Sequence, residues 1–265
     1  MLSQPSAHQL VCTSCQRPYV VMEDGILCLL PSAAKSLPPE YEDPDYKRMS
    51  EMFDDAQDYF TNGNPIFRAI HDSAHIRLSK WALQSSDNGD WVCDLGCGQG
   101  YHLQFQANTQ NVIGVDIRME SLKKIRDRFP QAILIQANSC ALPFKDNALS
   151  DIRSVYALEH IYYLSDTLSE VARVLRPEGS LYVGLPCEGG LAWTLGRELT
   201  SIRTMSKRYN LDYRKYIALE HCNRASDIAK ALDKYFWVQK RAFYPLGILP
   251  FFNTNLTASF SLKLR

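Results

Sequence analysis

From residue 91 onward, short apolar runs alternate with longer segments in which apolar residues recur at helical spacing. A strand followed by a helix and then by another strand places the two strands parallel in one sheet, with crossover helices on both faces. This order predicts an α/β fold with a doubly wound sheet. The expected strands are residues 91–94, 112–116, 133–137, 151–155 and 180–185, and the expected helices are residues 101–107, 119–129 and 164–175.

Two late apolar segments extend the pattern. Residues 235–243 and 256–264 follow a helical patch at residues 226–232, and they suit a terminal antiparallel hairpin. With the five earlier strands they predict a Rossmann-like, seven-stranded sheet that is mostly parallel and has an antiparallel last strand.

Composition divides the chain into three regions. Residues 1–35 are expected to form a small β module. Residues 36–88 hold a linker rich in Pro, Ser and acidic residues and two N-terminal helices. Residues 89–265 form the main domain, with a helical insertion at residues 186–225 that is placed to cover a substrate.

Overall composition excludes several classes of protein. The 265 residues carry 29 Lys and Arg against 29 Asp and Glu, and 46% are hydrophobic, which excludes a disordered tail and a generally basic nucleic-acid coat. The apolar stretch at residues 242–252 is shorter than the roughly 20 residues of a spanning helix. The first nine residues lack the basic start and apolar core of a secretory signal, so we expect a cytoplasmic protein with reduced cysteines.

A glycine-rich loop follows the first predicted strand of the main domain. Residues 92–100 read VCDLGCGQG, which includes Asp94, Gly96, Gly98 and Gly100. Glycines let the backbone turn tightly and approach a ligand, and the next helical segment offers free backbone N–H groups. Ligands of doubly wound sheets bind beyond the carboxyl ends of the strands, which is where this loop is expected.

The second predicted strand of the main domain ends in Asp116, about 20 residues after the loop, where an acid accepts hydrogen bonds from ribose hydroxyls. These two features alone also fit a nicotinamide or flavin enzyme. However, Asp94 at the head of the loop would repel a pyrophosphate. A ligand with a positive centre and an amino group suits the loop better. The alternative for Asp116 is a solvated acid at a strand end.

From residue 91 to residue 185 the chain resembles the class I S-adenosylmethionine-dependent methyltransferases, of the type 11-like kind. The resemblance is ordered, so it is far more specific than one glycine loop. Besides the loop and Asp116, it rests on Gln136-Ala137-Asn138-Ser139, Leu142-Pro143-Phe144, residues 151–155, Leu158-Glu159-His160 and the segment from Glu170 to Gly179.

The resemblance implies that S-adenosylmethionine is the cofactor, and it implies where the cofactor lies. Gly96, Cys97, Gly98 and Gly100 would line the methionine part, with Asp94 near its amino group. The other predicted contacts are Asp116 and Ile117 at the ribose and adenine, Asn138 and Ser139 at the adenine edge, and Tyr156 over the sulfonium. The family usually has Asp where this chain has Asn138, and an amide oxygen still accepts the same hydrogen bond. We interpret Cys97 as a small residue in a crowded loop, without a redox role.

Methyl transfer needs positioning and desolvation above all, and a general base matters chiefly for a hydroxyl acceptor. The predicted catalytic residues are His160, His221 and Tyr156, with Glu159 and Glu220 as further candidates. Two alternatives stay open. Leu158-Glu159-His160 also suits a structural corner in which His160 bonds the backbone, and Glu220-His221 also suits a structural pair.

The insertion mixes charged and aromatic residues in a way that could hold an anionic or sugar-bearing acceptor. The alternative is a solvated amphipathic helix pair. The residues concerned are Arg197, Glu198, Arg203, Lys207, Arg208, Asp212, Arg214, Lys215 and Glu220, with Trp193, Tyr209, Tyr213 and Tyr216 between them. The apolar loop at residues 243–252 either borders the same pocket or seals the sheet edge.

Cys12 and Cys15 have the spacing of half a zinc knuckle, but a structural zinc site wants four ligands and no second pair follows. We expect no metal there, with zinc completed by His8 as the alternative. The segment from Cys12 to Pro31 resembles a degenerate form of the zinc-ribbon-like module that precedes some methyltransferases.

The expected function is methyl transfer to a small-molecule, glycan-linked or lipid-linked acceptor. One alternative is an rRNA guanine-N1 methyltransferase, because the N-terminal module and Asp58-Tyr59-Phe60 with Gly63 resemble enzymes of that kind. The zero net charge argues against an RNA acceptor. A second alternative is a non-catalytic binding module with a methyltransferase-like fold. The oligomeric state is not predicted.

Overall fold

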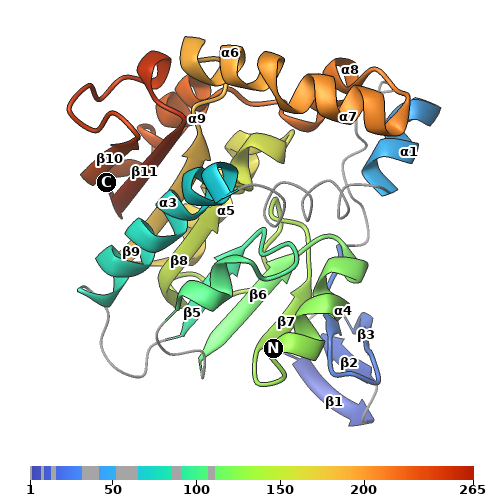
Figure 1. Ribbon diagram of the computed structural model, residues 1–265. Coiled ribbons are helices and arrows are strands. Elements are labelled where there is room, and N and C mark those ends of the chain that lie inside the picture. The colour runs from blue at the N-terminus through green and yellow to red at the C-terminus, as the bar shows by residue number, and fades with distance from the viewer. Residues whose placement is uncertain are drawn as a thin grey trace.

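A computed structural model describes residues 2–6, 9–12, 16–31, 42–51, 65–84, 91–106 and 111–265. The described part of the chain forms an eleven-stranded mixed sheet with helices packed on its two faces (Figure 1). The sheet order is β1-β2-β3-β4-β7-β6-β5-β8-β9-β11-β10. The predicted count of seven strands was therefore wrong, and the four added strands come from the N-terminal region.

The centre of the sheet is parallel, as the alternation of strands and helices predicts. Neighbouring strands pair in the order β7-β6-β5-β8-β9. The side chains of these strands are almost all buried, on both faces of the sheet, which explains why each strand is a nearly continuous apolar run in the sequence. The bounds are β5 (Val92–Leu95), β6 (Val112–Asp116), β7 (Ile133–Gln136), β8 (Leu149–Val155) and β9 (Leu175–Pro186).

The last two strands confirm the predicted hairpin. β10 (Phe236–Tyr244) and β11 (Thr257–Leu264) pair antiparallel with each other. β11 lies between β10 and β9 and runs antiparallel to both. The antiparallel last strand was therefore predicted correctly.

The N-terminal strands extend the sheet beyond β7. β1 (Leu2–Ser6), β2 (Gln9–Cys12), β3 (Pro18–Val21) and β4 (Leu27–Cys28) pair antiparallel in sequence order, and β4 then pairs parallel with β7. Ile26 is fully buried in a cluster that includes Leu134 of β7. This packing covers an edge of the parallel sheet that would otherwise expose unpaired backbone groups. The predictions for His8, Cys15 and the Cys12 side chain, and for residues 58–63, lie outside what the structure describes.

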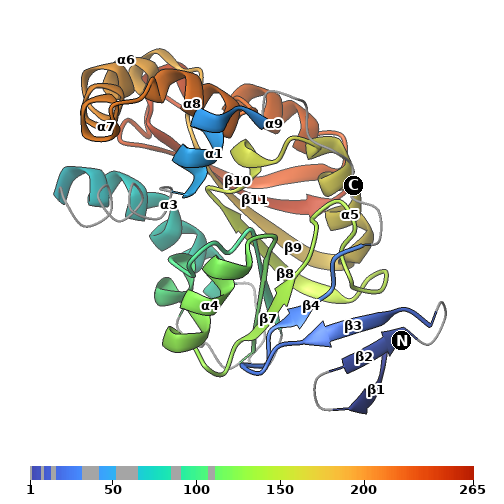
Figure 2. The same cartoon turned by 90° about the vertical axis from the view of Figure 1, so that its right-hand side faces the viewer.

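Helices cover both faces of the sheet (Figure 2). α3 (Pro65–Leu83) and α4 (Met119–Arg128) lie on one face, and α5 (Leu164–Val174) and α9 (Ala225–Leu232) lie on the other. α1 (Pro44–Glu51) and α3 are the two expected N-terminal helices. Where a helix is expected at residues 101–107, the described residues form one short 3-10 turn, η2 (His102–Phe105), and the backbone is extended at Gln106. Two further 3-10 turns are η3 (Leu158–His160) and η4 (Phe252–Thr254).

Three helices lie beyond the carboxyl ends of the parallel strands (Figure 1). They are α6 (Leu191–Leu199), α7 (Ser201–Tyr209) and α8 (Tyr213–Glu220). Asp212 caps α8 by accepting backbone N–H groups of its first turn. These helices belong to the insertion of residues 186–225, which we call the cover. The cover has its own apolar cluster, made of Ile202, Met205, Tyr209, Tyr213, Tyr216 and Ile217. Among the helices that the structure describes, none has the length and apolar character of a membrane span.

Candidate active site

The glycine bend lies at the point where the strand order reverses. β5 is flanked by β6 on one side and β8 on the other, so the loop that leaves β5 opens into the crevice between diverging connections. Gly96, Gly98 and Gly100 have φ angles of +71°, +50° and +75°, which favour glycine. Gly96 and Cys97 donate their backbone N–H groups to the Val115 carbonyl at 2.8 and 3.1 Å. The end of β6 therefore holds the bend in place.

Two glycines of the bend have different surroundings. A Cβ atom at Gly96 would lie 2.5 Å from Cβ of Ala157, so this position packs against the chain itself. A Cβ atom at Gly98 would meet nothing within 4 Å. Gly98 therefore presents bare backbone to an open space, which is what the close approach of a ligand requires.

Asp116 ties the bend to the next loop. Its Oδ2 accepts the Gly98 N–H at 2.8 Å, and its Oδ1 accepts the Arg118 N–H at 2.8 Å. A carboxylate oxygen has two lone pairs, so each oxygen retains the capacity to accept one more hydrogen bond. Asp116 can therefore order the bend and receive ligand hydroxyls at once.

Asp94 is a buried acceptor without a partner for one oxygen. Its side chain is 2% exposed, and its Oδ2 atom has no hydrogen-bond partner among the described residues. Burial raises the pKa of Asp94 to about 7, although the charge of Arg153 opposes the shift. Arg153 is itself engaged by Asp151 through two hydrogen bonds, of 3.0 and 2.8 Å. A buried oxygen of this kind suits a cationic amino group.

The predicted adenine contacts form the loops after β6 and β7. The Ile117 side chain is 55% exposed at the carboxyl edge of the sheet. Asn138 accepts the Cys140 N–H at 2.9 Å, which shapes the loop after β7. The Ser139 hydroxyl lies 2.9 Å from the Thr167 hydroxyl of α5. The contacts of these three residues with adenine stay a prediction.

Tyr156 follows β8 with a φ angle of +56°, which is unusual for a residue with a side chain. Its hydroxyl donates to the His71 carbonyl at 3.0 Å, and its ring stacks on the His71 ring at 4.9 Å. Burial raises the pKa of the phenol. The structure thus places Tyr156 against α3, and its predicted contact with a sulfonium remains a prediction.

A group of histidines beside Tyr156, made of His71, His75 and His102, was not predicted from the sequence. Nδ1 of His75 and Nδ1 of His102 are 3.0 Å apart, so one ring donates and the other accepts. Burial lowers the pKa of both rings, that of His102 to about 3, which keeps them neutral. The spacing of His71 and His75 by four residues places both on one helix face and was the available signal.

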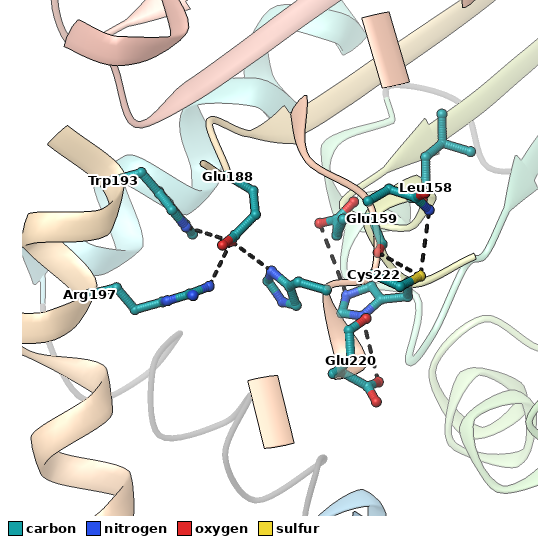
Figure 3. A network of polar contacts seen from close by, with 10 residues as sticks. Leu158, Glu159, Glu188, Trp193, Arg197, Glu220 and Cys222 are labelled. Atoms are coloured by element: carbon teal, nitrogen blue, oxygen red, sulfur yellow. Dashed lines mark hydrogen bonds and ion pairs between the residues drawn. The ribbon is translucent and has the colours of Figure 1, made fainter. Parts of the chain in front are cut away.

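Glu188 is the centre of a second polar cluster, in which it contacts Trp193 and Arg197 (Figure 3) and also His221. Nδ1 of His221 lies 2.9 Å from Oε2 of Glu188. The same oxygen accepts Trp193 Nε1 and Arg197 Nη1, each at 2.7 Å. Burial favours the neutral form of Glu188, but the hydrogen bond and charge of His221, with Arg197 and Trp193, outweigh it and keep its pKa below the usual value. An ionised carboxylate only accepts hydrogen bonds, so Nδ1 of His221 is the donor here and Nε2 is the other nitrogen of the ring.

His160 faces His221 although 61 positions separate them in the chain. Their ring centroids are 4.7 Å apart, edge to face. Nδ1 of His160 donates to the Glu220 carbonyl at 3.0 Å, as the structural reading of this corner expects. Burial, with His221 and Arg118 nearby, lowers the pKa of His160. The predicted residues His160 and His221 thus meet, whereas Tyr156 belongs to the other cluster.

Two further acids complete this centre. Glu220 accepts the Tyr46 hydroxyl of α1 at 2.8 Å, which ties α8 to α1. Glu159 is 1% exposed, and burial raises its pKa to about 8. Glu188 was absent from the predicted candidates. Its partners lie 5, 9 and 33 residues away, so no local motif marked it.

Arg118 connects the two halves of the site. Its backbone N–H binds Asp116, and its charge acts on His160 and on Tyr216 of α8. The histidine pair therefore lies beside the loop that follows Asp116. The strand ends supply the glycine bend, and the helical insertion supplies histidine and acidic side chains next to it.

Part of the chain is similar in sequence and in fold to methyltransferases. Residues 93–183 match the family model described as a methyltransferase domain. A probable S-adenosylmethionine-dependent methyltransferase of Mycobacterium tuberculosis is 33% identical over 96 residues, which cover 36% of this chain and 35% of that protein. The phthiotriol/phenolphthiotriol dimycocerosates methyltransferase of the same species is 30% identical over 143 residues, covering 51% and 53%. The chain thus spans about a third to a half of these relatives.

A solved structure of a methyltransferase shares the fold. The S-adenosylmethionine-dependent methyltransferase of Thermotoga maritima, a possible histamine N-methyltransferase, superposes with a TM-score of 0.55 at 15% identity. The match covers 83% of this chain and 100% of that chain. Residues 93–183 thus match a methyltransferase domain, and the Mycobacterium tuberculosis relative of this part of the chain is a probable S-adenosylmethionine-dependent enzyme. The open backbone at Gly98 and the unpaired oxygen of Asp94 fit that cofactor.

Proposed function

We propose that the chain methylates a small-molecule, glycan-linked or lipid-linked acceptor bound between the strand ends and the cover of residues 186–225. The observation that carries this proposal is the hydrogen bond of 2.9 Å between His221 and the buried carboxylate of Glu188, beside His160 and the Asp116 loop. S-adenosylmethionine supplies a methyl group that its sulfonium has already activated. The chain itself binds, orients and desolvates the two partners.

Each cofactor-binding residue has a distinct task in this proposal. Asp94 receives the cofactor's amino group, Asp116 its ribose hydroxyls, and the backbone of Gly96, Cys97 and Gly98 lies against the methionine part. Gly100 completes the bend, where a Cβ would lie 3.0 Å from Ile125. Ile117, Asn138 and Ser139 border the adenine, and Tyr156 lies nearest the sulfonium.

His221 is the proposed general base. Glu188 fixes its tautomer and stabilises the protonated ring, so Nε2 is the atom that takes a proton from the acceptor. His160 packs against His221 and keeps the ring in place. A base of this kind favours a hydroxyl acceptor over an amine.

The cover favours an acceptor with an apolar or sugar-like body. Trp193 and Arg197 of α6 point toward Glu188, as Figure 3 shows, so aromatic and cationic groups line the same wall. The Mycobacterium tuberculosis relative whose name specifies phthiotriol and phenolphthiotriol dimycocerosates supports the lipid-linked class within this proposal.

Radiolabelled methyl incorporation tests the proposal. The chain and labelled S-adenosylmethionine are incubated with cell extract that is then divided into small-molecule, lipid and RNA fractions. Label in the small-molecule or lipid fraction, absent with Gly98→Asp, is the expected result. Label confined to RNA would establish the rRNA alternative. Cofactor binding without label in any fraction would favour the non-catalytic alternative.

A further inference from the structure

Exposed apolar side chains gather on α6 and on the loop between β10 and β11, which Figure 1 shows beside α6. We call this surface the apolar ridge. Its α6 members lie four residues apart on one helix face. The ridge consists of Leu191, Leu195 and Leu199, which are 73%, 62% and 55% exposed, and of Leu246, Ile248, Leu249 and Phe251, which are 45%, 91%, 43% and 61% exposed.

The two parts of the ridge are fixed relative to each other. The start of α6 lies directly on η4, since a Cβ at Gly190 would come 2.2 Å from the Phe252 carbonyl oxygen. Close backbone packing of this kind leaves little room for the loop to shift. Leu191 and the loop side chains therefore form one surface.

A buried asparagine holds the loop in its outward shape. Asn255 is fully buried, and its Oδ1 accepts the Leu246 N–H at 2.7 Å. Its Nδ2 donates to the carbonyls of Leu249 and Phe251 at 2.6 and 3.0 Å. The backbone of the loop is thus satisfied internally, while its large side chains face outward. A loop built to pack on the sheet would bury them instead.

Charged residues are distributed unevenly next to the apolar ridge. Residues 245–256 contain no charged residue, and α7 contains three basic residues and no acidic one. All three, Arg203, Lys207 and Arg208, are exposed, and α7 follows α6 after Thr200, whose φ and ψ are not helical. Exposed apolar side chains on one helix, followed by exposed basic side chains on the next, have the composition of segments that lie in the interface of a membrane.

We propose that the apolar ridge docks on an anionic lipid bilayer, with Leu195, Ile248 and Phe251 in the headgroup region and α7 against anionic headgroups. The charges are complementary, since acidic lipid attracts basic side chains near the surface. This inference goes beyond the methyl acceptor, because vesicle binding requires no methyl transfer. It also gives α6 two faces, one on the bilayer and one, through Trp193 and Arg197, on Glu188.

Vesicle flotation of the full chain tests the proposal. Vesicles contain either phosphatidylcholine alone or equal parts of phosphatidylcholine and phosphatidylglycerol. The test variant combines Leu195→Ser with Ile248→Ser. The matched control combines Leu83→Ser with Val238→Ser, which are 57% and 47% exposed elsewhere on the surface. The variant Arg203→Gln with Lys207→Gln tests the basic row.

We expect the chain to float with the anionic vesicles and the ridge variant to bind at least about tenfold more weakly, with the control unchanged. The basic-row variant should lose the preference for phosphatidylglycerol. No flotation of the unaltered chain, or equal loss in ridge and control variants, would overturn the proposal. A dimer in sedimentation equilibrium that only the ridge variant dissociates would also overturn it, because a second copy would then occupy the ridge.

Discussion

Gly98 and Asp116, which are 18 residues apart in sequence, share a hydrogen bond of 2.8 Å between backbone N–H and Oδ2. The bond joins the loop after β5 to the end of β6. Asp116, which is predicted to contact the ribose, thus also shapes the bend that is predicted to hold the rest of the cofactor. Loss of this one carboxylate oxygen should therefore affect the whole cofactor site.

Asp116→Asn replaces one acceptor oxygen by an N–H₂ group, which cannot accept from Gly98 or from Arg118. The affinity for S-adenosylmethionine should fall at least about tenfold, or by about 1.4 kcal/mol. Calorimetric titration measures the change. Asp127→Asn on the exposed side of α4 is the control and should bind as the unaltered chain does. Equal affinities for both variants would remove Asp116 from the site.

Alanine at Gly96 should mainly lower the stability of the fold, whereas alanine at Gly98 should mainly lower the affinity for the cofactor. Both residues have positive φ, which costs alanine about 1–2 kcal/mol. Gly96→Ala also collides with Ala157, so its thermal unfolding temperature should drop more than that of Gly98→Ala. Gly98→Ala should stay folded and lose cofactor affinity. Comparable stability losses, or intact affinity in Gly98→Ala, would contradict the assigned surroundings.

Stability should decrease as the pH rises from about 5 to about 8 and should then level off. Glu159 has a folded-state pKa of about 8 because of burial, against an ordinary value of 4.5. Between these two values the folded state holds a proton that the unfolded state has released, so stability falls from about pH 4.5 until the folded acid ionises near pH 8. The pKa of Asp94 is raised from 3.8 to about 7, so Asp94 adds to the same decrease below pH 7.

Glu159→Gln is the variant that tests this pH dependence. The amide mimics the protonated acid, so its unfolding free energy should vary less across the window. Glu178→Gln, at an exposed position, should keep the dependence of the unaltered chain. A slope that Glu159→Gln leaves unchanged would place the titration elsewhere.

Glu188→Gln should separate catalysis from cofactor binding. The amide cannot stabilise a protonated His221, so turnover should drop about 100-fold while S-adenosylmethionine affinity changes little. Glu198→Gln is the control. Glu198 lies near the end of α6, where Arg214 is its partner at the surface, so this variant should leave turnover unchanged. Steady-state kinetics with the acceptor found by methyl incorporation measures both. Normal turnover in Glu188→Gln would leave His221 without a catalytic role.

The sequence was sufficient for the parallel core because its strands are buried on both sides and separated by helices. β6 matched its predicted range, since Asp116 ends an otherwise apolar run. β9 begins at Leu175, earlier than expected, because Leu175 already pairs with Leu149. Residues 176–178, which include two charged residues and follow within the strand, hid this start in the sequence. The pairing of β4 with β7 was missed, because a two-residue strand has no period to detect.

The site was predictable only where its residues lie close together in sequence. The bend and Asp116 form a local motif, and the chain places them in contact. The partnership of His221 with Glu188 joins segments 33 residues apart, and its meeting with His160 depends on how the cover folds back. Such long-range meetings leave no periodic pattern, so His160 and His221 were predicted separately and Glu188 was not predicted.

The central claim is that the bend from Asp94 to Gly100, with Asp116, holds S-adenosylmethionine. Isothermal titration calorimetry of the unaltered chain and of Gly98→Asp tests it most directly. We expect saturable one-site binding to the unaltered chain and none to Gly98→Asp, whose carboxylate would enter the open space beside Gly98. No binding to the unaltered chain, or equal binding to the variant, would contradict the claim.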